Sequence, residues 1–181
     1  MSGLVFNDND IKIASDKPSR DIKKNNSGVS ADAVFQSESY NKARKWGIAV
    51  AQEFINDANK YPLTEENDYE MTVQRRLLLS FTATVGFAEY AENDDLDGIA
   101  QKSFLDTLKC DDLKLYETAQ DTGAFSFYYL AFRRGGDIVR RIGQTFAMLC
   151  SHDGDPIYQE LGEALYCWFL SVVKQAKIEH N

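Results

Sequence analysis

The residues with the clearest chemical potential are arginines that occur side by side. Six of the eight arginines form three such pairs, and two of these pairs flank the double glycine Gly135-Gly136. A glycine turn that leads into a helix offers free backbone N–H groups at the positive end of the helix dipole, and guanidinium groups bind phosphate through two parallel hydrogen bonds. The candidate anion-binding residues are therefore Arg133, Arg134, Arg140 and Arg141.

The same stretch also has a second interpretation, as a joint between two packed helices. Asp137 follows the glycines and suits the cap position of the next helix, where its carboxylate would satisfy the free N–H groups and repel an anion. The glycine pair lacks the longer glycine-rich pattern of phosphate-binding loops. The arginines would then lie on solvated faces or pair with acidic residues between 89 and 121. We favour the joint over the anion site.

Just before the glycines, five aromatic residues fall within the eight positions Phe125–Phe132. Aromatic rings beside arginine can stack on nucleic-acid bases, but a net charge of -8 argues against nucleic acid as a partner. Every third or fourth residue lies on one helical face, yet the segment also has β-propensity, so its period leaves helix and strand both open. We prefer a helix and expect burial of Phe125, Phe127, Tyr128 and Phe132.

Patterns that would bind a metal ion are incomplete. His152 and His180 are the only histidines, so the dipeptide His152-Asp153 lacks the additional histidine that a His-Asp metal site needs. The acidic run 93–98 begins like a calcium loop, but Phe104 stands where such a loop requires a bidentate glutamate. Three widely spaced cysteines do not supply paired zinc ligands. We therefore predict no metal site.

Patterns for catalysis are incomplete as well. Cys150 and His152 are two residues apart and point to different sides of a helix end, so a buried thiol is expected there. The carboxylate pairs at 89/92 and 160/163 lack the Glu-x-x-His motifs of di-iron helices and are interpreted as surface charge. No nucleophile elbow or dinucleotide fingerprint occurs. We predict no catalytic residue and no cofactor, which favours a non-enzymatic role.

Composition indicates one globular domain. The chain has 181 residues, of which 44% are apolar and 12% aromatic, enough to bury a single core. Its acidic excess is local, because ten acidic residues face only three lysines between Glu89 and Asp121. The odd number of cysteines, with no C-x-x-C pair, fits reduced thiols. The start of the chain lacks the pattern of a secretory signal. We predict a cytoplasmic protein.

Apolar residues spaced three and four apart predict an all-α single-domain bundle of about six helices. Two longer antiparallel helices are expected at 37–61 and 64–91, and a C-terminal pair at 137–151 and 155–178. Shorter helices between 97 and 134 would bridge them. The expected helix caps are Asp95 or Asp97, Asp111 or Asp112, Asp137 and Asp155, and Gly123 is expected to end a helix. The polar residues 1–30 are predicted to form a flexible, loosely attached segment before the helical domain 31–181.

The last helix is apolar nearly all round between Ala164 and Val173. A run of ten residues is too short to span a bilayer, which needs about 20, so no membrane association is expected. Such a helix is typical of the centre of a bundle or of a dimer interface. Trp168, Phe169 and Val172 are therefore candidate interface residues of a homodimer.

Two functions follow from these observations. The leading hypothesis is a non-enzymatic protein-interaction module that self-associates. The alternative is binding or hydrolysis of a phosphate-bearing small molecule, with the arginine pairs holding the anion and Glu160 and Glu163 holding a metal. The two hypotheses differ in geometry, because the alternative needs the arginines and the glutamates to line one concave pocket.

Overall fold

The computed structural model describes residues 31–64 and 69–180, and these residues form seven α-helices and no strand. The all-α bundle predicted from the periodicity is confirmed. The predicted segment 1–30 lies outside the described residues, as do residues 65–68. In chain order the helices are α1 (Ala31–Lys60), α2 (Tyr69–Tyr90), α3 (Asp94–Asp111), α4 (Leu113–Ala119), α5 (Thr122–Arg133), α6 (Ile138–Leu149) and α7 (Pro156–His180).

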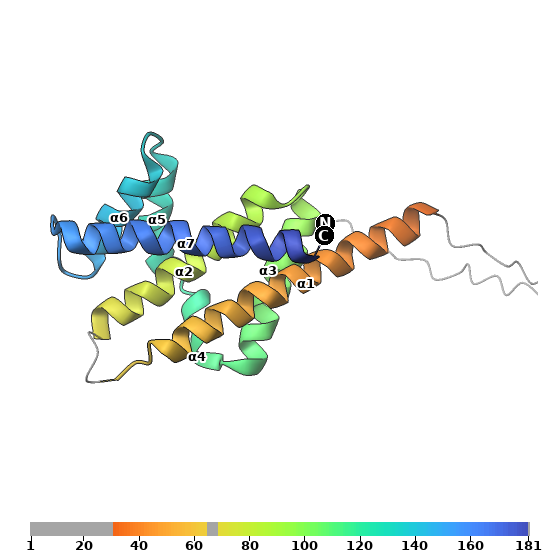
Figure 1. Ribbon diagram of the computed structural model, residues 1–181, viewed down its shortest axis with the longest axis horizontal. Helices are drawn as coiled ribbons and strands as arrows, with labels where there is room; N and C mark the ends of the chain where they lie inside the picture. Colours follow the sequence, from red (N-terminus) through yellow and green to blue (C-terminus); the bar gives the residue numbers. More distant parts are fainter. Residues whose placement is uncertain (1–30, 65–68, 181) are drawn as a thin grey trace, which may run out of the picture.

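Three long helices, α1, α2 and α7, organise the bundle. Helix α1 packs chiefly on α3 and α7, while α7 also packs along α2 and α6. Helix α4 connects α3 to α5, and α5 and α6 form a hairpin at the end of the molecule where α7 begins (Figure 1). Within the described residues, no helix has the length and apolar content needed to cross a bilayer.

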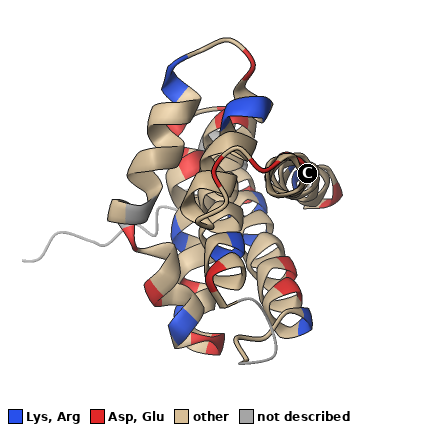
Figure 2. Ribbon diagram, turned by 90° about the vertical axis from the view of Figure 1, so that its left-hand side faces the viewer, with Lys and Arg blue, Asp and Glu red and all other residues tan. Residues whose placement is uncertain are grey.

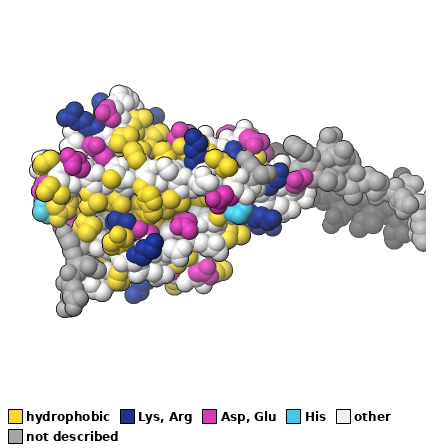
Figure 3. Space-filling view, in the orientation of Figure 1, with side chains coloured by type: hydrophobic (Ala, Val, Ile, Leu, Met, Phe, Trp, Pro, Cys, Tyr) yellow, Lys and Arg dark blue, Asp and Glu magenta, His cyan; other side chains and the backbone are white. Residues whose placement is uncertain are grey.

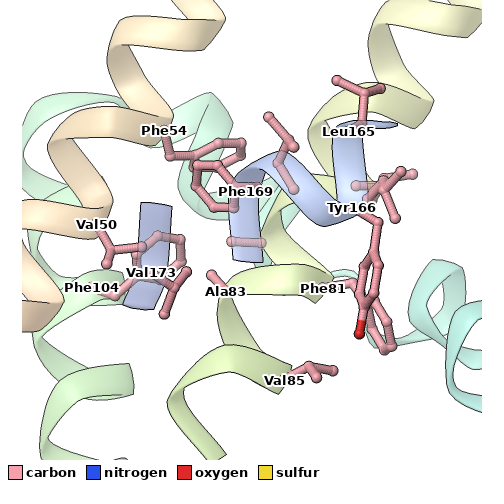
Figure 4. Packing of buried hydrophobic residues seen from close by; sticks show 14 of the residues in the cluster. Val50, Phe54, Phe81, Ala83, Val85, Phe104, Leu165, Tyr166, Phe169 and Val173 are labelled. Atoms are coloured by element: carbon pink, nitrogen blue, oxygen red, sulfur yellow. The ribbon is translucent and has the colours of Figure 1, made fainter. Parts of the chain in front are cut away.

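Aromatic rings contributed by different helices meet in the core, among a larger number of aliphatic side chains. Phe54 of α1 lies 6.0 Å from Phe104 of α3 and 6.1 Å from Phe169 of α7, measured between ring centroids (Figure 4). Phe81 of α2 forms a second centre that contacts four rings of α5 at 5.5–6.4 Å. Each fully buried side chain of this size contributes about 1.5–3 kcal/mol, so these rings fix how the helices pack.

The crossing of α6 and α7 depends on two glycines. A Cβ atom at Gly162 would lie 2.6 Å from the Cβ of Phe146, and one at Gly143 would lie 2.5 Å from the backbone oxygen of Gln159. Atoms cannot approach so closely without displacement. The absence of side chains at these positions therefore sets the closeness of α6 and α7.

Most predicted helix ends are confirmed. Asp112 caps α4 and Asp137 caps α6, each through a carboxylate that accepts hydrogen bonds from the first turn. The carboxylate of Asp155 accepts from the backbone N–H of Ile157 at 2.8 Å, just before α7 begins at Pro156.

Three boundaries differ from the prediction. Asn93 caps α3, rather than Asp95 or Asp97, because its extended backbone lets its side chain accept from Leu96 N–H. The two aspartates instead lie in the first turn, where the helix dipole favours acids. Helix α1 begins at Ala31 rather than at 37, and Gly123, expected to end a helix, lies inside the first turn of α5.

Candidate functional site

The aromatic segment Phe125–Phe132 is helical and forms most of α5, so the preferred interpretation is confirmed. Phe125 and Tyr128 are buried against Phe81, as expected. The predicted burial of Phe127 is wrong, because 49% of this residue is exposed. Two residues along a helix correspond to a rotation of about 200°. Phe127 therefore projects from the face of α5 opposite to Phe125.

The turn between α5 and α6 is the predicted joint. Gly135 and Gly136 have φ values of 66° and 76°, a region that glycine enters without steric cost. Asp137 then accepts a hydrogen bond from the backbone N–H of Arg140 at 3.1 Å. The carboxylate thus takes the cap position that an anion bound at this helix end would need.

Between α5 and α6 runs an open groove with a volume of about 670 Å³, which we call the α5–α6 groove. Three of its large apolar residues are exposed, Phe127, Leu130 (56%) and Met148 (41%). Exposed apolar side chains gathered in a concave surface make this groove a candidate docking site. The lining consists of Phe127, Leu130, Ala131, Arg134, Arg141, Gln144, Thr145, Ala147, Met148, Asp153, Gly154 and Gln159.

The four candidate arginines gather at this hairpin but do not all line the groove. Arg134 and Arg141 line it, whereas Arg133 and Arg140 are exposed outside it. In residues 31–64 and 69–180, none of the four forms an ion pair, so the predicted pairing with the acidic region 89–121 is not found there. Figure 2 shows basic positions on both sides of the joining loop, at the top of that view. The α5–α6 hairpin therefore carries a local excess of positive charge, although the net charge of the whole chain is -8.

The glutamate pair does not line the groove with the arginines. Neither Glu160 nor Glu163 lines the α5–α6 groove. Instead, the Oε1 atom of Glu163 accepts a hydrogen bond from the side chain of Gln159 at 2.9 Å. No cluster of three or more His, Cys, Asp or Glu side chains in the described part of the chain is arranged to hold a metal ion. The hydrolytic alternative requires the four arginines and both glutamates to line one concave pocket. Two of the arginines do so, and neither glutamate does.

Cys150 and His152 do not share an environment. The Cys150 side chain is buried, whereas His152 is exposed and its ring stacks on Tyr158 with centroids 3.8 Å apart. This arrangement agrees with the expected buried thiol. Cys110 and Cys167 are exposed, and none of the three cysteines is in a disulfide.

The interface candidates on α7 occupy different environments. Phe169 is fully buried against Phe54 and lies in the monomer core, and Val172 is partly buried. Trp168 is 41% exposed. Of the three, Trp168 presents the largest surface to a partner.

Next to Trp168 lies an arrangement that the sequence analysis missed. The guanidinium of Arg75 lies 4.1 Å from the ring centroid of Tyr61 and 5.9 Å from that of Trp168. Its charge is balanced by the carboxylate of Asp57, 2.6 Å away. The sequence singles out the pair Arg75-Arg76. However, Asp57, the partner of Arg75, lies 18 residues earlier on another helix, so no local sequence pattern indicates this ion pair.

Cys167 directly precedes Trp168 on α7 and is also exposed. Partial desolvation by neighbouring atoms raises the pKa of its thiol, and the nearby carboxylate of Glu163 raises it further. Both effects disfavour the thiolate, which is the reactive form of cysteine. The thiol is therefore suited to report on exposure of this face rather than to act as a nucleophile.

Comparison of the chain with models of protein families, with curated proteins and with solved structures found no match. The function is therefore inferred from the geometry of the described residues alone.

Proposed function

We propose that this protein is a non-enzymatic interaction module that docks an apolar, acidic segment of a protein partner in the α5–α6 groove. The observation that carries the proposal is the exposed trio of Phe127, Leu130 and Met148 beside Arg134 and Arg141. A concave apolar strip is the surface that the apolar face of a partner helix occupies.

The charge of the groove selects the partner's chemistry. Arg134 and Arg141 have no ion-pair partner among the described residues, so carboxylates of a docked segment would meet uncompensated positive charge. Among the described residues that line the groove, Asp153 is the one acidic residue. Complementary charge speeds association and excludes basic segments.

A displayed library of short peptide segments, selected on the purified protein, tests this proposal. Peptides that combine apolar residues with Asp or Glu should be enriched, and their binding should weaken about tenfold or more in Arg134→Glu, Arg141→Glu or Leu130→Ala, as hot-spot changes do. Arg44→Glu is the matched control, because Arg44 is an exposed arginine of α1 outside the groove. Enrichment of basic peptides, no enrichment, or equal binding by the groove variants would overturn the proposal.

Binding of a phosphate-bearing small molecule is the second candidate, favoured by the shared position of Arg134 and Arg141 in one groove. Against it, Asp137 already accepts the hydrogen bond from the first turn of α6 that a phosphate bound at this helix end would need. Inorganic phosphate and nucleotides should raise the melting temperature if this candidate holds. No shift at millimolar concentration would remove it.

We also propose that the protein self-associates through the surface around Trp168. Hydrophobic side chains gather along the face that α7 crosses (Figure 3). Tryptophan, tyrosine and arginine are the residue types enriched at binding hot spots, and Trp168, Tyr61 and Arg75 meet here. Because Asp57 neutralises Arg75, two copies of this surface can meet without like-charge repulsion.

Cys167 provides the test of self-association. Its alkylation should slow as the protein concentration rises, whereas alkylation of the exposed Cys110 of α3 should not change. Trp168→Glu should remove the concentration dependence and give a monomer in sedimentation. A wild-type chain that stays monomeric at high micromolar concentration would contradict the proposal.

We propose a cytoplasmic location, supported by the exposed and unbridged thiols of Cys110 and Cys167, which a reducing compartment preserves. The prediction that nucleic acid is not a partner rests on the net charge of -8. A filter-binding assay with duplex and single-stranded DNA at physiological salt would test it.

A further inference from the structure

A second cavity lies on the other side of α5, where α2, α3, α4 and α5 converge, and we call it the four-helix cavity. Its volume is about 540 Å³, within the range of about 300–1,000 Å³ that small-molecule sites occupy. Phe125 and Tyr129 of α5 line it, whereas Phe127 and Leu130 of the same helix line the α5–α6 groove. The two sites are therefore distinct.

The chemistry of the lining is aromatic and uncharged. The rings of Phe87, Phe104 and Phe125 are all nearly or fully buried, and those of Phe87 and Phe104 lie edge to face, 5.8 Å apart. No Lys, Arg, Asp or Glu belongs to the part of the described chain that lines the cavity. In a protein with 27% charged residues, this lining disfavours a charged ligand, because a charge there would lose its water without gaining a counter-ion.

A few polar groups would orient an occupant. The Thr84 hydroxyl donates to the backbone oxygen of Ser80 at 3.3 Å, and the Gln101 side-chain N–H donates to Asp97 at 2.7 Å. Both side chains line the cavity and retain oxygen atoms that can accept a hydrogen bond. A ligand with an N–H or O–H group matches these acceptors.

The hollow is an open surface pocket rather than an interior void. A surface pocket of this volume with a mainly apolar lining is the usual form of a ligand site. It is open at Tyr129 and Gln120, which are exposed, so a ligand has a path from solvent.

We propose that the four-helix cavity binds a neutral, flat aromatic small molecule that carries a hydrogen-bond donor. This site is independent of the proposed peptide-docking function. Its ligand lies against the apolar lining beside the exposed Tyr129 ring and donates to the Thr84 or Gln101 oxygen.

Two fluorescent probes with the same ring system test the proposal. N-phenyl-1-naphthylamine is neutral and has one N–H group, whereas 8-anilinonaphthalene-1-sulfonate adds a sulfonate to the same framework. The neutral probe should bind saturably at one site and about tenfold tighter than the anionic one, since the sulfonate is unpaired in this cavity. Hydrogen exchange on binding should slow in peptides covering 80–87, 101–105 and 119–129.

A matched pair of substitutions locates the site. Thr84→Leu fills the cavity and should weaken binding of the neutral probe about tenfold, as blocking an apolar pocket does. Thr107→Leu is the control, because Thr107 makes the same bond to a carbonyl four residues earlier but lies in a different hollow beside Arg44.

Hydrogen exchange on the wild-type chain keeps the proposal testable if Thr84→Leu does not fold. No saturable binding, tighter binding of the sulfonate, or protection confined to 138–154 would overturn it. Protection at 138–154 would place the probe in the α5–α6 groove, so the two sites are tested separately.

Discussion

Both carboxylate oxygens of Asp57 accept hydrogen bonds from the guanidinium of Arg75: Oδ1 from Nη2 at 2.6 Å and Oδ2 from Nε at 2.9 Å. The side chains are only 5% and 12% exposed, so the pair joins the last turns of α1 to α2 away from water. It also holds the guanidinium against Tyr61 and near Trp168. One ion pair thus links the stability of the bundle to the surface proposed for self-association.

Breaking this pair should destabilise the protein strongly. Asp57→Asn leaves a nearly buried guanidinium without its counter-ion, which costs about 3–5 kcal/mol. The double variant Asp57→Asn/Arg75→Met should recover part of the lost free energy of unfolding, because it also removes the unpaired guanidinium charge. Glu38→Ala, which breaks the exposed pair with Lys42, should cost less than about 1 kcal/mol. Urea unfolding measures all three, and a loss below 1 kcal/mol for Asp57→Asn would contradict the assignment.

Two glycine-to-alanine changes should have opposite signs. A Cβ at Gly47 of α1 would lie 2.2 Å from the backbone oxygen of Ala100 in α3, so Gly47→Ala should cost about 1–3 kcal/mol through overpacking. A Cβ at Gly98 of α3 would meet nothing within 4 Å, so Gly98→Ala should gain about 0.5–1 kcal/mol from helix propensity. Thermal unfolding of both variants checks the contrast, and equal effects would refute the close α1–α3 crossing.

Removing one hydroxyl group should stabilise the core. Tyr128 is fully buried and its hydroxyl has no hydrogen-bond partner in the described structure. Because an unsatisfied buried donor costs about 1–3 kcal/mol, Tyr128→Phe should raise the free energy of unfolding by about 1 kcal/mol. Tyr129→Phe, on the exposed side of the same helix, is the control and should change it by less than about 0.5 kcal/mol. A clear loss of stability in Tyr128→Phe would reveal a bond at that hydroxyl.

Stability should fall at alkaline pH partly through Tyr166. Burial raises the pKa of its phenol from 10.0 to about 12 in the folded protein, and the nearby Glu89 carboxylate adds to this shift. Between these values the unfolded chain has released the proton and the folded chain still holds it, so unfolding becomes easier as pH rises. Absorbance at 295 nm follows phenolate formation. In Tyr166→Phe the free energy of unfolding should fall less steeply between pH 10 and about 12 than in the wild type. An identical pH dependence in the two proteins would contradict the raised pKa of Tyr166.

Local patterns predicted the helices and many of their ends. The three- and four-residue spacing of apolar residues specifies helix, and Asp112, Asp137 and Asp155 occupy caps that need only neighbouring backbone N–H groups. The period of Phe125–Phe132 leaves helix and strand both open, because its β-propensity competes with the helical pattern of the segments around it. Packing of its buried face on Phe81 accounts for the outcome.

The exposure of individual side chains could not be predicted from local sequence patterns. Phe127 and Phe169 are both aromatic residues in apolar runs, yet Phe127 is half exposed and Phe169 is fully buried. The difference depends on which helix faces each side chain, and that is set by long-range packing. The α5–α6 groove was only partly foreseen, since the sequence singled out four arginines but could not show that Leu130 and Met148 would join two of them.

The sequence by itself determined an acidic chain of amphipathic helices with capped ends, because charge, periodicity and capping depend on residues within a few positions of one another. Only the tertiary structure decided that Asp57 meets Arg75, that four helices leave an uncharged cavity, and that two arginines share a groove with exposed apolar side chains. These features join residues from different helices. They arise when the chain reverses direction and buries its apolar faces, and no single helical segment encodes that arrangement.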